Sequence, residues 1–575
     1  TMNHKKDFAV IFNKLEMPLL HINEVKLLET MYVDPMSASI LAKLKEPTNF
    51  KGLLLRANEI LEDDNYRNPN SLPGLIYKEL TKAMKEHEGR AFFSKSKIVV
   101  NPYSVMNKIT ESSTIMLEDD LNPMAGIKQF EDMTAMGTLG RSKETMSRDT
   151  RQVYENDIGV VSEAARDSGD VGISSYLSAD PSIGDIRGSL DIKEDLSMTN
   201  IFSSSAMLAP FGLNDDSKRL NFASIMNSHI IPVKEMRAPY VLTGYEAIVP
   251  VKAASKFVEH ALEKGKVIGV SNKEVVVEYD KQGIKKYKLK EWTTKELSGT
   301  CYTHKLVPNV KPGQKINKDD TIVYDELFFE PAMFQPSRVI YKQGNVVTVA
   351  LSEEALTDED SGKVSHRLSN MFTANVTKVK SIVVSMVKVG DKIEPTSSLF
   401  TIVNQLVNEK ELDARALSIL EDIKNSSPKA KVKGIVKKID FRYNCNIEDL
   451  SSSLKTMITE NDKKLKQEVG YTGQVDSTYS IQGKPLSEKE VEIKIYIESE
   501  DIMGMGDKGI LSNQLKFTVG EVMDYDITSM DGRPIDMLFS YRAISARIVT
   551  SPILIGTTSL LLEKVTEDIC DIYFK

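Results

Sequence analysis

Cysteine is scarce in this sequence, whose 575 residues contain three: Cys301, Cys445 and Cys570. They lie far apart, without a CxxC pair and without a histidine at metal-ligand spacing. We therefore expect neither a disulfide framework nor a zinc ribbon. Long apolar runs are also missing. None reaches the roughly 18 residues of a membrane helix, and the first residues lack the apolar stretch of a signal peptide. These absences predict a cytoplasmic protein that does not bind a membrane.

Recognisable catalytic motifs are absent too. The sequence has no Walker loop, GxGxxG fingerprint, GxSxG elbow, HExxH motif or EF-hand loop, and its seven histidines are scattered. It also lacks an Asp-x-Asp-x-Asp cluster, although two-metal phosphoryl transfer needs several carboxylates that converge on magnesium. We therefore predict that this chain holds no metal, and that a partner supplies any catalytic ion.

What the sequence does contain is typical of a folded protein with several domains. Charged residues make up 27% and hydrophobic residues 41%, and a chain of this length is expected to divide into roughly three to five domains. The net charge of −8 argues against a protein that coats DNA by itself, because phosphate binding requires lysine and arginine. A basic groove on an acidic protein remains compatible with nucleic acid.

The hydrophobic pattern changes along the chain. Helical periodicity prevails from about Ile11 to Lys85, and residues 116–180 are typical of ordered loops and short elements. Asn214-Asp215-Asp216 offers N-cap chemistry for a helix that ends before Pro232. Residues 265–270 and 274–279 are β-branched and predict two short strands.

Two further segments suggest repetition and protrusion. Residues 310–316 match residues 387–393 at five of seven positions, which indicates either a repeat or two similar hairpins without common ancestry. Helix-prone residues 403–425 and 446–469 flank a basic strand at 429–438. We interpret this part as a protruding module, whose lysines either line nucleic acid or form an ordinary solvated strand face.

Three cations stand beside glycines or caps. Lys508 lies in the glycine-rich segment 503–512, where bare backbone lets a phosphate approach closely. Arg219 lies on the helix after Asp215 and Asp216, and Arg547 follows the segment 532–536. Each has a structural alternative. Lys508 fits an ordinary turn, Arg219 a surface ion pair with an acid three or four residues earlier, and Arg547 a common loop position.

Taken in order, these sites belong to longer segments with one shared pattern. The segments are Pro210-Phe211-Gly212-Leu213-Asn214-Asp215-Asp216-Ser217-Lys218-Arg219 with Met226, Pro232 and Gly244-Tyr245-Glu246-Ala247, then Gly506-Asp507-Lys508-Gly509-Ile510, then Gly532-Arg533-Pro534-Ile535-Asp536 with Ser545-Ala546-Arg547-Ile548. Asn122-Pro123-Met124, Arg151, Thr300-Cys301 and Pro312-Gly313 extend it. This pattern resembles the β subunits of bacterial multisubunit DNA-dependent RNA polymerases, over their middle portion. It suggests a split β subunit of the kind that giant bacteriophages encode.

The resemblance implies a multidomain α/β (α+β) fold with a helical fork and lobe, β-barrel-like modules and a flap-like domain. The implied divisions are a lobe and fork-leading region at 1–115, a fork-loop and rifampicin-pocket region at 116–200, a nucleotide-facing helix with barrel-like modules at 201–375, a flap-like domain at 376–495, and an active-site loop that returns to the core at 496–575. The flap-like module appears without the long tip helix that promoter-specificity factors grip, which argues against standard sigma docking.

The resemblance also implies residue roles. Lys508 would hold the RNA 3′ end and the α-phosphate, while Arg219 and Arg547 would face the β- and γ-phosphates of the incoming nucleotide. The remaining residues fall into three sets: Asp215, Asp216, His229, Gly506 and Asp507 near RNA and nucleotide; Arg141, Lys143 and Arg151 at the nucleic-acid fork; and Asp119, Gln129, Asp132 and Thr134 at the positions of the rifampicin pocket.

Some positions depart from the family pattern. Glu500 replaces the family's first active-site lysine, and Val346-Val347 replace its Glu-Asp pair. Gln129, Asp132 and Thr134 replace the usual His, Arg and Ser of the drug pocket, which predicts resistance to rifampicin. The alternative function is therefore a degenerate, non-catalytic β homologue that acts as an assembly scaffold.

We expect a nucleotidyltransferase subunit that is active only within a complex. Its partners would be β′-like subunits with an aspartate triad that binds Mg²⁺, the remaining β-like polypeptides, a promoter-specificity factor, template DNA, RNA and nucleoside triphosphates. The expected location is the cytoplasm of an infected bacterial host, with packaging in the virion left open.

Overall fold

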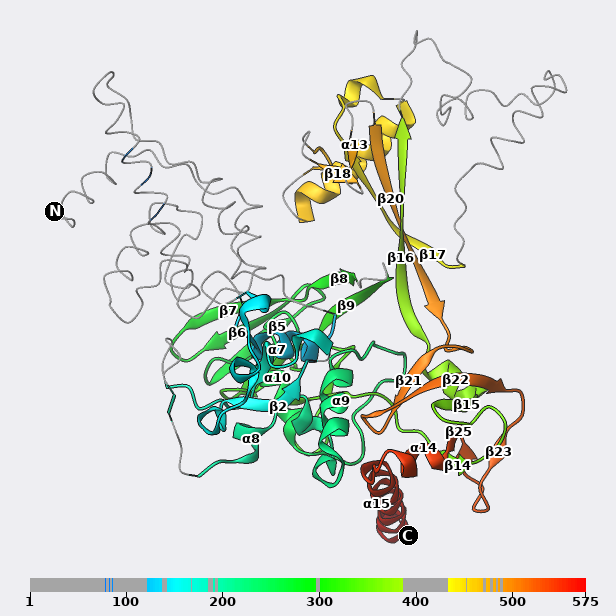
Figure 1. Ribbon diagram of the computed structural model, residues 1–575. Coiled ribbons are helices and arrows are strands. Elements are labelled where there is room, and N and C mark those ends of the chain that lie inside the picture. Colours follow the sequence, from blue (N-terminus) through cyan, green and yellow to red (C-terminus); the bar gives the residue numbers. More distant parts are fainter. Residues whose placement is uncertain are drawn as a thin grey trace. The chain divides into compact units, whose positions relative to one another are not determined.

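The computed structural model describes residues 121–136, 142–166, 168–184, 190–191, 195–295, 300–385, 433–450, 452–468, 472–475, 479–481, 484–486 and 490–574, with Lys78, Lys82 and Lys85 (Figure 1). Contacts divide the chain into two compact units. Unit 1 comprises residues 1–120 and 125–207, and unit 2 comprises residues 121–124 and 208–575. The predicted helical region before residue 115 lies outside the described residues, apart from those three lysines.

Unit 1 contains short elements around one small sheet, as the sequence predicted for residues 116–180. Its strands β1 (Asp132–Thr134), β3 (Ser174–Leu177) and β2 (Val161–Ala165) pair antiparallel in the order β1-β3-β2. The helical elements are α7 (Pro123–Glu131), η2 (Lys143–Thr145), η3 (Asp149–Arg151), η4 (Glu155–Asp157), η5 (Ser168–Asp170), α8 (Met198–Ile201) and η6 (Ala206–Leu208), of which α7 and η6 cross into unit 2.

The first sheet of unit 2 has the order β10-β5-β6-β7 and is predicted well by the sequence. It consists of β5 (Gly265–Val270), β6 (Glu274–Tyr279), β7 (Gly283–Lys288) and β10 (Lys315–Ile316). Residues Val275, Val277 and Tyr279 alternate into a core, because successive side chains of a strand point to opposite faces. The prediction of strands at 265–270 and 274–279 is confirmed. The second copy of the suggested repeat, at 387–393, lies outside the described residues.

A seven-stranded sheet continues from this core into the segment that the sequence predicted to be flap-like. Its path is β17-β20-β16-β9-β11-β4, and β8 also pairs with β9. Strands β16 and β20 pair antiparallel along their full twelve residues. The bounds are β4 (Val258–His260), β8 (Glu291–Lys295), β9 (Thr300–Pro308), β11 (Thr321–Asp325), β16 (Ala374–Ser385), β17 (Ile435–Tyr443) and β20 (Glu490–Asp501).

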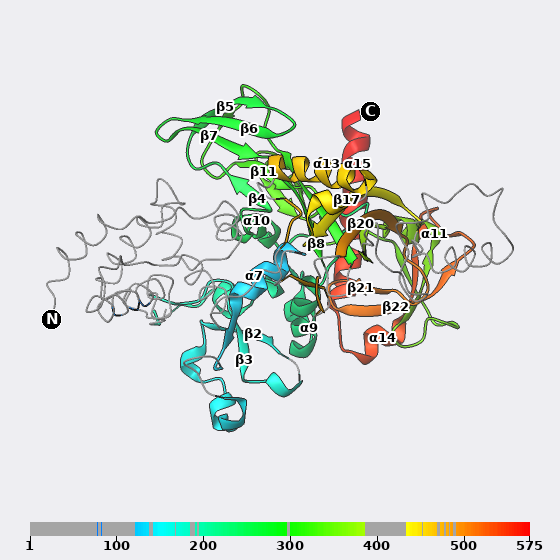
Figure 2. The same ribbon diagram turned by 90° about the horizontal axis from the view of Figure 1, so that it is seen from above.

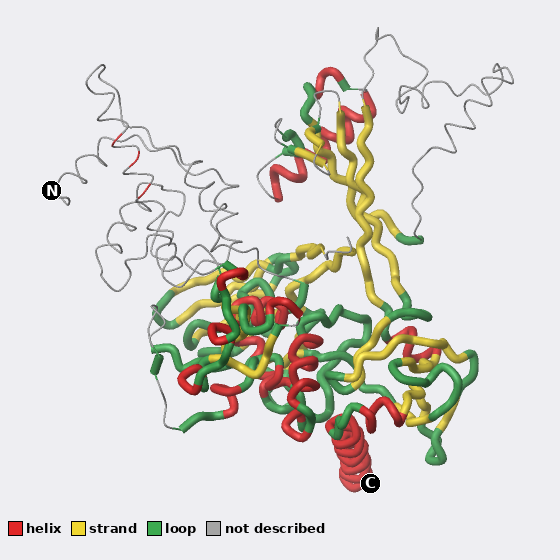
Figure 3. Tube along the Cα trace, viewed as in Figure 1, coloured by secondary structure: helices red, strands yellow, loops and turns green. Residues whose placement is uncertain are grey.

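Helix α13 (Ser452–Glu468) covers the far end of these strands (Figure 3). The hydroxyl of Tyr443 on β17 donates to the carboxylate of Asp462 on α13 at 2.6 Å, and a small apolar core packs around them. The segment 386–432 lies outside the described residues, so the missing tip helix and its consequence for sigma docking stay predictions.

A five-stranded mixed sheet, ordered β14-β25-β15-β22-β21, forms the rest of the core with α11 and α14. The bounds are β14 (Val349–Ser352), β15 (Ser361–Ser365), β21 (Lys508–Leu511), β22 (Leu515–Met523), β25 (Met537–Ser540), α11 (His366–Met371) and α14 (Tyr541–Ala546). Smaller elements of unit 2 are η7 (Gly212–Asn214), α9 (Ser217–Asn227), η8 (Tyr245–Ala247), α10 (Val249–Lys252), β12 (Phe329–Pro331), β13 (Val339–Tyr341), η9 (Ile447–Asp449), β18 (Ser480–Ile481), β19 (Lys484–Pro485), β23 (Ile527–Thr528), β24 (Pro534–Ile535) and α15 (Ser551–Phe574).

The mixed α/β class is confirmed, but no sheet within the described ranges closes into a barrel (Figure 2). The barrel-like modules are therefore open sheets here. The domain boundaries predicted from the sequence stay predictions. No helix among the described residues has both the length and the apolarity to cross a membrane.

Candidate anion-binding site

The hairpin of β21 and β22 provides the platform of the candidate site. Its turn places Ser512 and Asn513 in the left-handed region, at φ of 49° and 70°, as tight hairpin turns require. Gly509 pairs with Phe517 across the hairpin, and a Cβ at this glycine would lie 2.4 Å from the ring. Gly509, the residue after Lys508, must therefore be glycine, because a larger residue would overlap the Phe517 ring.

Lys508 begins strand β21 and is exposed. The preceding residues form a tight turn, in which Gly506 has a φ of 90° and the Gly504 N–H donates to the Asp507 carboxylate at 2.8 Å. The Gly506 N–H donates to the Val519 carbonyl at 2.8 Å, and the Val519 N–H donates to the Asp507 carbonyl at 2.9 Å. Backbone bonds thus fix the position from which the lysine projects.

Asp215 joins three distant segments of the chain. Its carboxylate accepts the N–H groups of Thr550 and Ser551 at 2.8 and 2.9 Å, at the start of α15. It also accepts a bond from the buried Gln514 at the tip of the hairpin. A carboxylate at a helix N-terminus is favourable because the first N–H groups lack partners within the helix. Asp215 therefore holds the start of α9, the hairpin tip and α15 together.

Arg547 caps the C-terminus of α14, and its guanidinium forms an ion pair with Asp360, which precedes β15. Its side chain is 19% exposed. Burial and the positive charge of Arg219 lower the pKa of Arg547, while Glu359 acts in the opposite direction. Two arginines from α9 and the end of α14 therefore lie close enough to repel each other.

Lys508 is linked to Arg547 through the sheet. Thr518 on β22 pairs with Lys508 on one side and with Ser361 of β15 on the other. The Thr518 N–H donates to the carbonyl of Asp360 at 2.7 Å. Because neighbouring strands lie about 4.8 Å apart, the Cα atoms of Lys508 and Ser361 are about 10 Å apart. We call Arg219, Lys508 and Arg547 the cation cluster.

This arrangement can bind an extended anion with several charges. Figures 1 and 2 both show α9 beside β21, with α14 close to the same sheet. The cations come from three elements that backbone bonds fix in place, so they need little rearrangement when an anion binds. A polyphosphate presents charged oxygens over a comparable length, whereas a single carboxylate would satisfy only one of the three.

The other residues predicted near RNA and nucleotide lie at different distances from this cluster. Asp216 is the N-cap residue of α9, but its side chain forms no capping hydrogen bond. His229 lies just beyond the C-terminal end of α9. Because this helix has eleven residues, that end is about 16 Å from the start of the helix. Arg219 lies 5.3 Å from the ring of Phe222. Among the described residues, Arg219 forms no ion pair with an earlier acid. The surface ion pair considered as its structural alternative is therefore not observed.

The two departures from the family pattern have clear surroundings. Glu500 pairs with Lys234 at 2.6 Å, so another segment brings an ammonium group to this carboxylate. Val347 packs partly buried against the core of the five-stranded sheet.

Sequence reasoning missed three supporting residues. Asp536 is buried and receives two bonds from Arg367, at 2.7 and 2.8 Å, and one from the Thr348 N–H at 2.9 Å. Asp536 is the last residue of the segment Gly532-Arg533-Pro534-Ile535-Asp536, whose resemblance to the family could have indicated this residue. Asp360 and Gln514 carried no such signal, because each acts through a partner more than a hundred residues away.

In unit 1, the residues at the drug-pocket positions lie on α7 and β1. Gln129 is on α7, Asp132 and Thr134 are on β1, and Asp119 lies outside the described residues. Arg166 forms an ion pair with Asp132 and stacks 5.8 Å from the Tyr176 ring, and Lys128 lies 4.7 Å from the same ring. Glu163 accepts the Ser203 N–H at 2.8 Å and its hydroxyl at 2.9 Å.

We call Lys128, Asp132, Glu163, Arg166 and Tyr176 the paired cluster. Burial lowers the pKa of Lys128 to about 8, although nearby acids oppose this, and burial raises the pKa of Asp132 and of Glu163. Each charged member therefore has a group of opposite charge nearby, and the Tyr176 ring lies beside the two cations.

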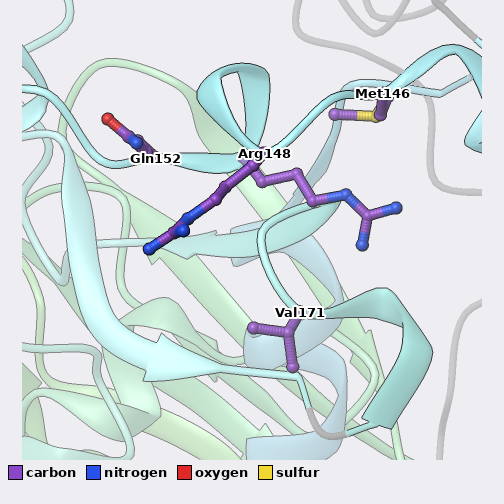
Figure 4. Close-up of a pocket in the computed structure, with 5 residues that line it drawn as sticks. Met146, Arg148, Gln152 and Val171 are labelled. Carbon is purple, nitrogen blue, oxygen red and sulfur yellow. The ribbon is translucent and has the colours of Figure 1, made fainter.

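Of the predicted fork contacts, Arg151 lines an open hollow of about 470 Å³ in unit 1. Met146, Arg148, Arg151, Gln152 and Val171 line it (Figure 4). Lys143 forms an ion pair with Asp170 at 2.8 Å, and Arg141 lies outside the described residues. Arg151 and Arg148 give this hollow a positive rim, whereas the charge of Lys143 is already paired.

A Thr-His-Asp arrangement occurs elsewhere in unit 2. Thr294 bonds the His304 ring at 3.0 Å, and the other ring nitrogen bonds Asp325 at 2.7 Å. All three side chains are buried, and Trp292 stacks on the histidine at 4.8 Å. Without access for a substrate, this network serves packing. Within the described ranges, no group of three acids, histidines or cysteines could hold a metal ion.

Comparison with known proteins gives partial matches to RNA polymerases. A family model described as bacteriophage RNA polymerase matches residues 1–144. The sequence is 25% identical over 378 residues to the DNA-directed RNA polymerase subunit beta of Mycoplasmopsis pulmonis, and this match covers 62% of the chain. The chain is a relative of polymerase β subunits.

Other β subunits support the same relationship. That of Mycoplasma genitalium is 23% identical over 366 residues, or 62% of the chain, and that of Thermus aquaticus is 29% identical over 129 residues, or 22% of the chain. The matches cover only a fraction of the lengths of these relatives, namely 29% of the Mycoplasmopsis pulmonis subunit, 25% of the Mycoplasma genitalium subunit and 11% of the Thermus aquaticus subunit.

Proposed function

We propose that this chain is a subunit of a DNA-directed RNA polymerase and forms the β side of its active site. Lys508 holds the RNA 3′ end and the α-phosphate, and Arg219 and Arg547 hold the β- and γ-phosphates of the incoming nucleotide. The observation that carries the proposal is the cation cluster, in which three segments that resemble the family converge at one end of the five-stranded sheet.

The chemistry of nucleotidyl transfer fits these cations. Negative charge develops on the leaving pyrophosphate, and fixed positive groups stabilise it without reorganisation in the transition state. In this proposal the Mg²⁺ belongs to a β′-like partner with the aspartate triad. Template DNA and RNA would also contact the predicted fork residues, including Arg151, whose hollow carries a second arginine.

The direct test is Lys508→Ala in the complex reconstituted with its β′-like subunits. We expect single-nucleotide elongation to fall roughly 10²–10³-fold, as when one charge-stabilising donor is removed, while the subunits still copurify. Lys516→Ala is the matched control, because Lys516 is also exposed and lies on the other strand of the same hairpin. Elongation equal for both variants and the unmodified complex would defeat the proposal.

The scaffold alternative has one observation in its favour. At Glu500, where the family carries a lysine, the carboxylate is paired with Lys234, so the net charge there differs from the family's. A scaffold needs no phosphate-facing cations, so Lys508→Ala and Arg547→Ala would then leave transcription unchanged. The same experiment therefore separates the two functions.

Resistance to rifampicin is a second expected property. Asp132 carries a negative charge where the family has arginine, and Arg166 already binds it. A drug that relies on the family's hydrogen-bonding groups would meet different ones on α7 and β1. Transcription by the complex should continue at a saturating drug concentration, with a bacterial polymerase as the sensitive control. Complete inhibition would contradict this expectation.

A further inference from the structure

We propose that helix α15 is the docking surface for an amphipathic helix of another subunit of the polymerase complex. The partner helix would carry an apolar stripe with lysine or arginine beside it. Because the partner is a subunit, the proposal rests on the membership of this chain in the complex, as proposed above. The nucleotide contacts leave α15 without a role, since Arg547 lies before the start of the helix.

One face of α15 is attached to the rest of unit 2. The N–H groups at its start donate to Asp215 at 2.8 and 2.9 Å. About three turns further along, Arg533 forms ion pairs with Glu563 at 2.5 Å and with Glu567 at 3.7 Å. Residues four apart lie on the same side of a helix, so both acids belong to one face. Attachment at two separate points fixes the direction of α15 and the face that it turns to the protein.

The other face of α15 carries an exposed apolar stripe. Six side chains, between 37% and 80% exposed, form this apolar stripe: Leu554, Leu561, Leu562, Val565, Ile569 and Ile572. Because each residue advances an α-helix by about 100°, they lie between about 160° and 260° from Glu563. The ion pairs with Arg533 therefore leave the stripe on the far side of the helix, where solvent reaches it.

The shape of the stripe fits a second helix. Leu554, Leu561, Val565 and Ile572 follow one another at spacings of seven, four and seven residues, which is the pattern of a helix that packs along another helix. At about 1.5 Å per residue, they extend over roughly 27 Å, too long for a single side-chain pocket. Figure 1 shows α15 extending away from the sheets of unit 2, toward the C-terminal label. The stripe is therefore presented along nearly the whole helix.

The charges beside the stripe select its occupant. Residues 563–571 contain four acids and one lysine, and that lysine, Lys564, pairs with Glu567 at 3.2 Å. The exposed Asp568 lies one turn after Val565, at the border of the stripe. A second copy of α15 would bring no spare cation to these acids, and helices that lie on membranes normally carry lysine and arginine instead. A partner helix with basic residues would pair with the acids, because complementary charges select partners.

The test compares two neighbouring leucines in the reconstituted complex. Leu561→Ser removes part of the stripe and should weaken the binding of this chain to its partner subunit about 30-fold, as for one hot-spot side chain. Leu560→Ser is the matched control, because Leu560 is also exposed, at 48%, but lies about 60° from Glu563, on the attached side. It should leave binding unchanged. Copurification over a range of protein concentrations measures both, and equal binding by the two variants would overturn the proposal.

A photoreactive benzoylphenylalanine in place of Leu561 identifies the occupant. Cross-linking in the assembled complex, followed by mass spectrometry, should give a peptide of another subunit with an apolar stripe and basic residues. A cross-link to a second copy of this chain, to added phosphatidylglycerol vesicles, or to no other molecule would overturn the proposal.

Asp568→Asn tests the charge of the partner. Loss of one exposed ion pair should weaken binding about two- to fivefold at low salt. The difference should vanish at high salt, because salt screens exposed charges. Tighter or unchanged binding at low salt would contradict a basic partner.

Elongation distinguishes failure of this docking surface from failure of the proposed function. If Lys508→Ala stops elongation while Leu561→Ser binds its partner normally, only the docking surface fails. If Leu561→Ser releases the chain while Lys508→Ala elongates normally, only the nucleotide contact fails.

Discussion

The paired cluster of unit 1 and the cation cluster of unit 2 contain the same kinds of side chain in opposite balance. In the paired cluster, Lys128 and Arg166 lie near three acids, Glu131, Asp132 and Glu163, and an aromatic ring. In the cation cluster, three cations come together beside two exposed acids, Glu359 and Asp360. The charges of the paired cluster are paired within the protein, whereas the cation cluster carries a net positive charge.

The difference teaches how to tell a structural charge network from a binding site. Burying a charge is costly unless it is paired and hydrogen-bonded, so a buried network must be close to neutral. A surplus of one sign persists only where solvent or a ligand compensates it. The backbone bonds around Asp215 and Gly506 hold the surplus in place, and the stability they provide does not depend on neutralising the cations.

Removing one arginine from each cluster should break this comparison most clearly. Arg166→Ala deprives the partly buried Asp132 of its ion pair and should lower the free energy of unfolding by about 2 kcal/mol, as for a hydrogen bond to a charged group. Arg219→Ala should change it by less than about 0.5 kcal/mol. Both changes in the free energy of unfolding can be measured by chemical denaturation of the assembled complex, with hydrogen exchange as the probe of unfolding in each unit. Equal losses would mean that the cation cluster is also structural.

The sequence predicted the elements of the cation cluster better than their connections. The cap at Asp215-Asp216 placed α9 correctly, since its helix runs from Ser217 to Asn227. The β-branched pattern placed β5 and β6, because hydrophobic alternation is a local property. Resemblance of short segments was the signal that singled out Arg219, Lys508 and Arg547 together.

The partners of these residues could not be predicted, because they are set by tertiary contacts. Asp215 near RNA and nucleotide stays a prediction, and the sequence did not indicate that its oxygens bind the start of α15 and the hairpin tip. Lys234 and Glu500 are 266 residues apart in the sequence, and nothing local in either segment indicates the pair. Asp360 lies in a run of three acids that has the appearance of an ordinary surface loop.

Gly509→Ala tests whether the backbone positions the cations. The added methyl group would overlap the Phe517 ring, which lies 2.4 Å from the Cβ position, so β21 and β22 must separate slightly. We expect a loss of about 1–2 kcal/mol in hairpin stability and slower elongation, because Lys508 is the preceding residue. Gly504→Ala is the control, since its Cβ would meet only the Ile502 carbonyl at 3.9 Å. Normal elongation with a destabilised hairpin would show that the placement of Lys508 tolerates movement of β21.

The smallest expected effect is a pH dependence confined to unit 1. Burial lowers the pKa of Lys128 to about 8, below its value of about 10.5 in the unfolded chain. Below pH 8 the lysine is charged in both states, and the folded state bears the full cost of burying that charge. Above pH 8 the folded state releases the proton first, so the unfolded state binds more protons and stability rises with pH. Between pH 8 and 9 the gain should be at most about 1 kcal/mol. Pulse-labelled hydrogen exchange in α7, corrected for intrinsic rates, measures this gain, and Lys128→Met should remove it. A gain of the same size in the β21–β22 hairpin would instead attribute it to the whole protein, and the contrast between the two clusters would lose its electrostatic basis.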